Sequence, residues 1–446
     1  MSTTVETRID VFSLNCWGLK YVSKRRSERI QAIARFLESS DFDIVALQEL
    51  WVYADYEIVR SRLSKSLPFS KFFYSGALGA GLAIFSRFPI VAAAIHPYSL
   101  NGSPLDVLGG DWFVGKAAAS IVIRHPTLGQ VQVFNTHLYA KGGEGGAEQH
   151  RAHRLVNAWE FAKLAKQAAE LGRYVIAAGD FNSVPTSLPM TVIREHASLS
   201  DAWEGTHPAS LALHCAVEAY GVTADSPLNT YSAGKSLDVH ARTFHGKRLD
   251  YILFRDPVSP LASAAPPPTL VAADARVLLT DTVPGLPFSY SDHFGVSATL
   301  HIRFPWDGSN HTSPDDGHIT TAQKQMPLAI STPFTPTRVS AKLTAADAAA
   351  VLGSLVTCYH HAHACAKRHL LIFGFTGAGR FPPQATPFVV LGSAVFTWLG
   401  TTMFYVGFVH GRWEVNALLN VIDELELYRK SVEVVPTTGE LMSIKP

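Results

Sequence analysis

The feature that most constrains the fold of this chain is the alternation of short apolar runs with helical stretches across residues 1–305. Runs rich in β-branched or aromatic residues and bounded by Gly, Pro, Asn or Asp are typical of strands. They lie at residues 9–14, 44–47, 82–85, 117–123, 131–134, 174–178 and 296–302. The clearest helix covers residues 147–171 and ends at Gly172. This pattern predicts one α/β domain with a mixed sheet, interrupted by turn-rich inserts at roughly 185–245 and 256–290.

The composition narrows the class of protein. The chain has 38 Lys and Arg against 37 Asp and Glu, and a net charge of +1 argues against wrapping nucleic acid through bulk positive charge. Because 47% of the residues are hydrophobic and 17% are charged, most of the chain is expected to fold. Four cysteines in 446 residues are too few for a disulfide scaffold, and residues 1–8 do not resemble a secretory leader. We therefore expect a reducing compartment, by default the cytosol.

Beyond residue 305 the sequence changes character twice. Residues 306–343 are rich in Pro, Ser and Thr and are interpreted as a linker. Residues 344–430 are predicted to be a helical membrane region, followed by a C-terminal tail at 431–446. Residues 381–411 contain no Asp, Glu, Lys or Arg, and the apolar run 387–409 would be about 34 Å long as a helix, enough to cross a bilayer. The alternative is a buried core helix, but such helices seldom lack charge over this length.

A second apolar segment lies at 369–379 and is too short to span a membrane by itself. It could form a first span together with the stretch before it, at the cost of placing several charged and histidine residues in the membrane. Those residues are His360, His361, His363, Lys367 and Arg368. The sequence therefore predicts a membrane anchor with the α/β domain facing the cytosol, and it leaves open whether there is one span or two and which organelle is involved.

Polar residues follow the ends of the predicted strands in a regular order. They are Asn15, Glu49, His137, Asp180, Asn182, Asp250, Asp292 and His293. Because polar residues just past apolar strands converge on one rim of a sheet, we expect these side chains to form a site. Taken singly, each is more often structural, as a turn former, a helix-start carboxylate or an ion-pair partner.

Together these residue types suit metal-assisted hydrolysis of a phosphodiester. Mg²⁺ prefers oxygen ligands, so Glu49 with Asn15 is a suitable holder. His293 has the pKa range needed to take a proton from an attacking water, and an aspartate, Asp250 or Asp292, would fix its tautomer. Donors for the developing oxyanion are also present, namely His137 and Asn182.

The motifs that carry these residues resemble those of the endonuclease/exonuclease/phosphatase superfamily. In chain order they are Leu14-Asn15-Cys16-Trp17-Gly18, Leu47-Gln48-Glu49, Asn135-Thr136-His137, Gly179-Asp180-Phe181-Asn182 and Ser291-Asp292-His293. Within that superfamily the chain is most similar to neutral sphingomyelinases and inositol phosphosphingolipid phospholipases C. Residues 149–154 and 223–230 support this similarity. So does the stretch 110–116, which looks like a family loop whose Asp and Lys, here Asp111 and Lys116, control whether the site is competent.

This resemblance implies a DNase-I-like four-layer α/β sandwich with a C-terminal helical transmembrane tail. The implied substrate is a sphingolipid in a bilayer, cleaved to ceramide and a phosphorylated headgroup, with Mg²⁺ as cofactor, anionic phospholipid as activator and no nucleic-acid partner. The resemblance also implies a role for each residue. Glu49 and Asn15 would hold or position Mg²⁺, and His293 would be the general base, oriented by Asp250. His137 and Asn182 would stabilise the pentacoordinate phosphate, and Asp180 would orient the water or the phosphate. Asp292 would support the metal or the base, and Lys116 would face phosphate or pair with Asp111.

Two rival functions are weighed against this one. A nuclease or inositol-phosphate phosphatase of the same superfamily would use the same residues, but a nuclease is expected to be basic and to lack an apolar tail. The phosphatases usually carry Asn-Tyr-Arg where this chain has Phe181-Asn182-Ser183. A membrane-tethered binding module without activity is expected to have lost one of Glu49, His137, Asp180 or His293, all of which are present. The motifs do not separate a choline-phosphate from an inositol-phosphate headgroup.

A basic cluster follows Gly18 and consists of Lys20, Lys24, Arg25, Arg26 and Arg29. Such a cluster is usually the solvated face of a helix. The alternative is contact with anionic lipid headgroups, at about 1 kcal/mol per charge near the membrane surface.

Overall fold

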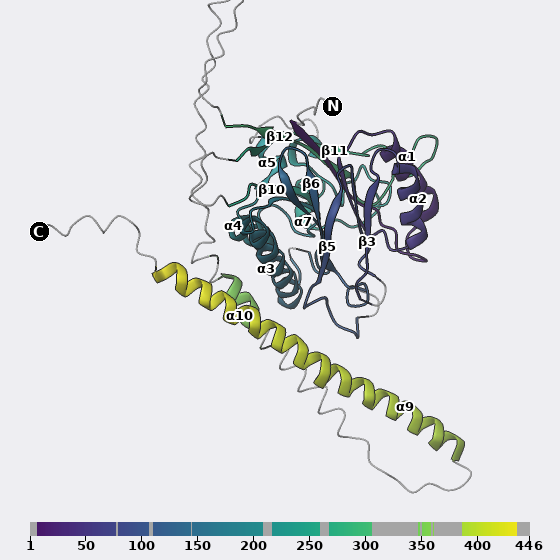
Figure 1. Ribbon diagram of the computed structural model, residues 1–446. Coiled ribbons are helices and arrows are strands. Elements are labelled where there is room, and N and C mark those ends of the chain that lie inside the picture. The colour runs from purple at the N-terminus through teal and green to yellow at the C-terminus, as the bar shows by residue number, and fades with distance from the viewer. Residues whose placement is uncertain are drawn as a thin grey trace, which may run out of the picture.

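Two β-sheets face each other and carry helices on their outer faces (Figure 1). The computed structural model describes residues 7–76, 79–106, 110–143, 145–207, 216–258, 267–305, 347, 350–357, 360 and 386–434. The predicted mixed α/β sandwich is therefore confirmed, with two sheets in place of the single mixed sheet that the strand pattern suggested. The predicted linker, the apolar segment at 369–379 and residues 435–446 of the predicted tail lie outside the described residues.

The first sheet has the strand order β11-β12-β1-β2-β4-β3, and its β1 and β2 run parallel. Its strands are β1 (Arg8–Asn15), β2 (Ile44–Gln48), β3 (Phe69–Phe73), β4 (Leu82–Ser86), β11 (Thr269–Leu278) and β12 (Gly295–Arg303). Strand β11 corrects the interpretation of residues 256–290 as turn-rich throughout. It lies at the sheet edge, paired with β12, and most of its side chains are partly or fully exposed. It therefore lacks the apolar run that marks a buried strand.

The second sheet has the strand order β5-β6-β7-β8-β10-β9, and its β7 and β8 run parallel. Its strands are β5 (Ile90–Pro97), β6 (Ala117–His125), β7 (Gly129–His137), β8 (Tyr174–Asp180), β9 (Ser200–Asp201) and β10 (Asp250–Arg255). The described residues of the predicted insert at 185–245 contain β9 and four helices, which are α4 (Leu188–Ala197), α5 (Ala202–Thr206), α6 (Ala216–Tyr220) and α7 (Val239–Thr243).

Each sheet is covered by helices whose apolar residues recur every three or four positions. In α1 (Arg26–Glu38), Ile30, Ile33 and Leu37 are buried against the first sheet together with α2 (Tyr53–Leu63). In α3 (Glu148–Glu170), the predicted apolar face is buried against the second sheet and α4. The candidate site lies apart from these helix–sheet contacts, at the carboxyl ends of the parallel pairs β1–β2 and β7–β8.

The core between the sheets is apolar and is crossed by a polar bridge. Ile9 and Val11 of β1 pack there against Ile176 of β8, among other apolar side chains. Within this layer Gln48 donates to Oδ1 of Asn135 at 2.7 Å, and Asn135 donates to the carbonyl oxygens of Leu47 and Ala83, both at 2.9 Å. Asn135 belongs to the second sheet and its partners belong to the first, so directional bonds fix how the two sheets face each other.

The C-terminal part of the described chain forms one long rod of α9 (Thr386–Phe404), η3 (Tyr405–His410) and α10 (Gly411–Val434) (Figure 1). Val415, Leu418 and Val421 of α10 join the apolar cluster around α3. Glu414 accepts a hydrogen bond from Nε2 of His153 at 2.9 Å, so the rod is docked on the sandwich. Among the helices of the described residues, none has both the length and the apolar character needed to cross a membrane.

A buried histidine at the end of β6 predicts a pH dependence of stability. Nδ1 of His125 accepts the backbone N–H groups of Thr127 and Leu128, at 3.1 and 3.2 Å, which requires that nitrogen to be unprotonated. Burial lowers the pKa of His125 to about 4. The unfolded chain, with a histidine pKa near 6.5, therefore binds more protons between pH 6.5 and 4, and stability falls as the pH drops through this window.

We expect His125 alone to account for a loss of about 2 kcal/mol of unfolding free energy between pH 7 and pH 5. The measurement is urea unfolding at both pH values for the natural protein and for His125→Asn, whose amide oxygen can accept the same N–H groups without titrating. The loss should be about 2 kcal/mol smaller in the variant. An equal pH dependence in both proteins would contradict the assignment.

Candidate functional site

The candidate site lies where the parallel strand pairs of both sheets end. In the first sheet Asn15 pairs in register with Gln48, directly before Glu49. In the second sheet His137 pairs with Asp180. Each sheet therefore contributes one half of the site, because parallel strands bring their carboxyl ends to the same edge.

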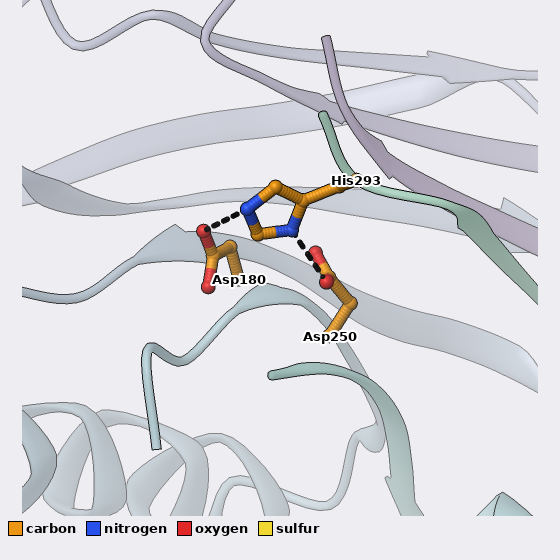
Figure 2. A group of neighbouring side chains, drawn as sticks. All are labelled: Asp180, Asp250 and His293. Carbon is orange, nitrogen blue, oxygen red and sulfur yellow. Dashed lines mark hydrogen bonds and ion pairs between the residues drawn. The ribbon is translucent and has the colours of Figure 1, made fainter. Parts of the chain in front are cut away.

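An imidazole lies between two aspartates at this edge (Figure 2). Nδ1 of His293 is 2.8 Å from Oδ2 of Asp250, and its Nε2 is 3.9 Å from Oδ2 of Asp180. Asp250 and Asp180 face each other across β10 and β8, and both are buried. A proton on Nδ1 shared with Asp250 leaves Nε2 as the nitrogen that can accept a proton.

A second group of side chains centres on Asn15. Its amide nitrogen donates to Oε1 of Glu49 at 3.1 Å and to Oδ2 of Asp180 at 3.0 Å, and its oxygen accepts the backbone N–H of Trp17 at 3.0 Å. Asn15 thus positions two carboxylates. Through Asp180, Glu49 belongs to the same site as His293, as the sequence predicted.

The backbone around Glu49 is unusually tight. Glu49 has a φ of 53°, in the left-handed region that non-glycine residues rarely adopt. Its carbonyl oxygen accepts the N–H of Gly18 at 2.9 Å, and a Cβ on Gly18 would lie only 2.4 Å from that oxygen. Gly18 is therefore needed for the loop after β1 to close against Glu49. Strain of this kind is a common mark of functional sites.

Lys116 connects the Asp111 loop to the site. Its ammonium is 2.8 Å from Nε2 of His137, donates to the carbonyl oxygen of Leu138 at 2.9 Å and pairs with Asp111 at 3.2 Å. These three partners match the three donors of the ammonium group. Of the two alternatives drawn from the resemblance, the structure shows Lys116 paired with Asp111.

The remaining predicted residues lie at the same edge. The backbone N–H of Asn182 donates to Asp180 at 2.9 Å, and its side chain donates to the carbonyl oxygen of Leu138 at 3.0 Å. Asp292 follows Ser291, whose hydroxyl donates to the carbonyl oxygen of Asn15 at 2.6 Å. The structure thus brings all of the predicted site residues together.

Comparison with known proteins decides the family. Residues 12–293 match the sequence model of the Endonuclease/Exonuclease/phosphatase family. The chain belongs to that family. It is 34% identical over 445 residues to the inositol phosphosphingolipids phospholipase C of Schizosaccharomyces pombe, which covers 96% of this chain and 95% of that protein. It is 31% identical over 320 residues to sphingomyelin phosphodiesterase 2 of Mus musculus, which covers 72% of this chain and 70% of that protein.

These relatives confirm the predicted resemblance, and with it the prediction of an enzyme of this phosphodiesterase group. Among solved structures, the crystal structure of SmcL aligns with a TM-score of 0.48 and 17% identity, covering 66% of this chain and 99% of that one. That likeness is too distant to carry any argument about the site.

The electrostatics of this family member show an excess of negative charge. Burial, then the neighbouring Asp292, raises the pKa of Glu49 above its ordinary value. Burial, then Asp250, raises the pKa of Asp180 to about 6. Burial alone would lower the pKa of His293, but Asp250, Asp180 and Asp292 outweigh it and raise that pKa well above its ordinary value. Two carboxylates whose pKa values are raised by burial and by a neighbouring negative charge are a fitting set for a divalent cation.

Two groupings of these donors could hold the cation. Asp180, Asp250 and His293 offer atoms within 4.8 Å of one another. However, Nδ1 of His293 is hydrogen-bonded to Asp250, so two of the three donors in that grouping already satisfy each other. The other grouping is Glu49, held by Asn15, together with Asp292; both side chains are partly exposed, and the charge of Asp292 raises the pKa of Glu49.

Sequence reasoning missed two polar residues that hold this site. Gln48 and Asn135 stand inside the recognised motifs, next to Glu49 and one residue before Thr136, but no role was assigned to them. Their signal was a buried amide at or near the end of a largely apolar strand, which is costly unless it is hydrogen-bonded.

Proposed function

We propose that this chain is a Mg²⁺-dependent phospholipase C that hydrolyses the phosphodiester of sphingomyelin or of inositol phosphosphingolipids. The products would be ceramide and a phosphorylated headgroup. The observation that carries this proposal is the His293–Asp250 pair, which lies beside Asp180 and in the same site as Glu49. The two relatives reported above are named for activity on such lipids.

In this mechanism neutral His293 takes the proton of the attacking water on Nε2, while the carboxylate of Asp250 on Nδ1 stabilises the imidazolium that forms. The neutral form requires the negative charge of the nearby carboxylates to be offset, because that charge raises the pKa of His293. Asp180, 3.9 Å from Nε2, is placed to orient that water. Asn182 would donate to the phosphate oxygens as negative charge develops on them, and His137 would donate through Nδ1, because its Nε2 accepts from Lys116. Lys116, bonded to His137 and Asp111, holds the imidazole of His137 in place.

Mg²⁺ would be held by Glu49 with Asp292, and Asn15 would position Glu49. When bound, the cation would neutralise the excess negative charge of the site and polarise a phosphate oxygen.

We further propose that the enzyme works at a membrane with anionic phospholipid as activator. The loop between β1 and α1 supports this, since Tyr21 is 92% and Val22 65% exposed, between the exposed basic residues Lys20, Lys24 and Arg25. Helix α9 supports it too, since its large apolar side chains are exposed, among them Phe396 and Trp398. Membrane anchoring with the site facing the cytosol remains a prediction from the sequence.

The proposal is tested with the purified full chain and headgroup-labelled sphingomyelin or inositol phosphoceramide. Each lipid is offered in vesicles with and without anionic phospholipid, and with Mg²⁺ or a chelator. We expect ceramide and a phosphorylated headgroup in equal amounts, only with Mg²⁺ and faster on anionic vesicles. Release of inorganic phosphate, or cleavage of nucleic acid in place of lipid, would instead identify one of the rival activities.

A further inference from the structure

Arg29 lies in the first turn of α1 and is fully buried, which contradicts its expected place on a solvated basic face. Lys24 and Arg25 of the same cluster are exposed, and Arg26 pairs with Asp55. In the described part of the chain no ion pair involves Arg29. A buried charge without a carboxylate partner is expensive, so other interactions must stabilise it.

The guanidinium of Arg29 is satisfied by backbone carbonyl groups. It donates to Cys16 at 2.7 Å, Trp17 at 2.6 Å, Lys24 at 2.9 Å and Tyr290 at 3.1 Å. It also lies over the ring of Trp17, 4.8 Å from the centroid, and 5.7 Å from the centroid of Tyr231. One side chain thus joins the loop after β1, the loop before β12 and the segment at 223–233.

Two hydrogen-bonded routes lead from Arg29 to the site. By the first route, Arg29 holds the carbonyl of Trp17, and the N–H of Trp17 donates to Asn15, which in turn holds Glu49. By the second, Arg29 holds the carbonyl of Tyr290, and the hydroxyl of the next residue, Ser291, donates to the carbonyl oxygen of Asn15. Both routes end at Asn15, whose side chain holds Glu49 and whose carbonyl oxygen is held by Ser291, the residue before Asp292.

We propose that Arg29 is a positioning residue that sets the spacing between Glu49 and Asp292, and thereby the affinity of the site for its cation. The inference rests on the proposed function in one respect, that the cation is Mg²⁺ held by these carboxylates. The hydrogen bonds of the Arg29 guanidinium described above go to backbone carbonyl groups and not to the carboxylates of Glu49 or Asp292. It acts by tying the loop that carries Asn15 to the loop that carries Asp292. Residues that orient ligands in this way typically change metal affinity or activity by about 10- to 100-fold when replaced.

The test compares Arg29→Lys with Arg154→Lys. Arg154 is an equally buried arginine that donates to the carbonyl groups of Tyr139, Ala140 and Gly143, so it matches Arg29 in burial and in type of partner. Lysine keeps the charge but cannot reach four carbonyl groups at once. Mg²⁺ binding is measured by titration calorimetry on the substrate-free full chain, alongside the melting temperature, kcat and KM.

We expect Arg29→Lys to weaken Mg²⁺ binding by at least about 10-fold and to lower kcat at subsaturating Mg²⁺. We expect Arg154→Lys to bind Mg²⁺ like the natural protein, although its melting temperature should fall about as far as that of Arg29→Lys. Equal Mg²⁺ affinity in the two variants would overturn the inference and leave Arg29 a stabilising residue. A natural protein that binds Mg²⁺ but leaves sphingolipids intact would overturn the proposed function alone.

If Arg29→Lys does not fold, Ser291→Ala tests the second route by itself, since it removes only the hydroxyl contact with Asn15. The expected change in Mg²⁺ affinity is in the same direction and smaller. Where both variants fold, their double variant should lose less affinity than the sum of the single losses, because both act through Asn15. An unchanged affinity in Ser291→Ala, or full additivity, would count against the inference.

Discussion

Replacing His293 by alanine is expected to lower kcat by roughly three orders of magnitude, because general-base catalysis of this kind contributes about 10²- to 10⁴-fold. The residue is placed for that role by Asp250 on Nδ1, which leaves Nε2 toward Asp180. KM should change little, since the imidazole acts on the water. The measurement is the initial rate of headgroup release at saturating lipid and Mg²⁺.

Asp250→Asn gives an independent reading of the same pair. It keeps a hydrogen-bonding side chain beside Nδ1 but removes the negative charge that stabilises the imidazolium, so its loss of kcat should be smaller than that of His293→Ala. His125→Asn is the matched control, since it replaces another buried histidine, which lies at the end of β6. It should keep full activity at pH 7. A His293→Ala protein with near-full activity would remove His293 as the base.

Replacing Glu49 by glutamine is expected to weaken Mg²⁺ binding by about 100-fold or more. Replacing a residue that only orients a metal ligand costs about 10- to 100-fold in metal affinity, and removing the ligand itself should cost more. The same change should raise the melting temperature of the metal-free protein. Burial and the nearby Asp292 raise the pKa of Glu49, so its ionised form is held at a cost that the neutral amide does not bear.

The Mg²⁺ affinity should fall while the melting temperature of the metal-free protein rises, so a general loss of structure cannot produce both results. Calorimetry gives the Mg²⁺ affinity, and thermal unfolding with chelator present gives the metal-free stability. Glu57→Gln is the control, because Glu57 sits on the surface of α2 paired with Arg60 and should change neither quantity substantially. If Glu49→Gln kept its Mg²⁺ affinity while Asp180→Asn lost it, the cation would belong instead to the grouping of Asp180, Asp250 and His293.

The order of site residues along the chain could be predicted because strand periodicity and polar strand ends are local signals. Asn15, Glu49, His137 and Asp180 each follow a strand whose β-branched run is plain in the sequence. The chemistry of the residue types predicted an aspartate beside His293, either Asp250 or Asp292, and the resemblance favoured Asp250. Neither signal required knowledge of how the sheets pack.

What could not be predicted depends on contacts between segments far apart in sequence. Arg29 looks like any solvated basic residue until the carbonyl groups of Cys16 and Tyr290 surround it. The docking of α10 was hidden for the same reason, since Glu414 and His153 are 261 positions apart. Strand β11 escaped because an edge strand with exposed side chains has no apolar run.

The polar bridge between Gln48 and Asn135 has a consequence for how this enzyme could fail. Apolar packing is not directional, so the apolar faces of the two sheets would tolerate a small displacement relative to each other. Such shear would carry Glu49 away from Asp180 while barely altering the buried area. We therefore expect damage to this bridge to appear as an enzyme that stays compact but is out of alignment.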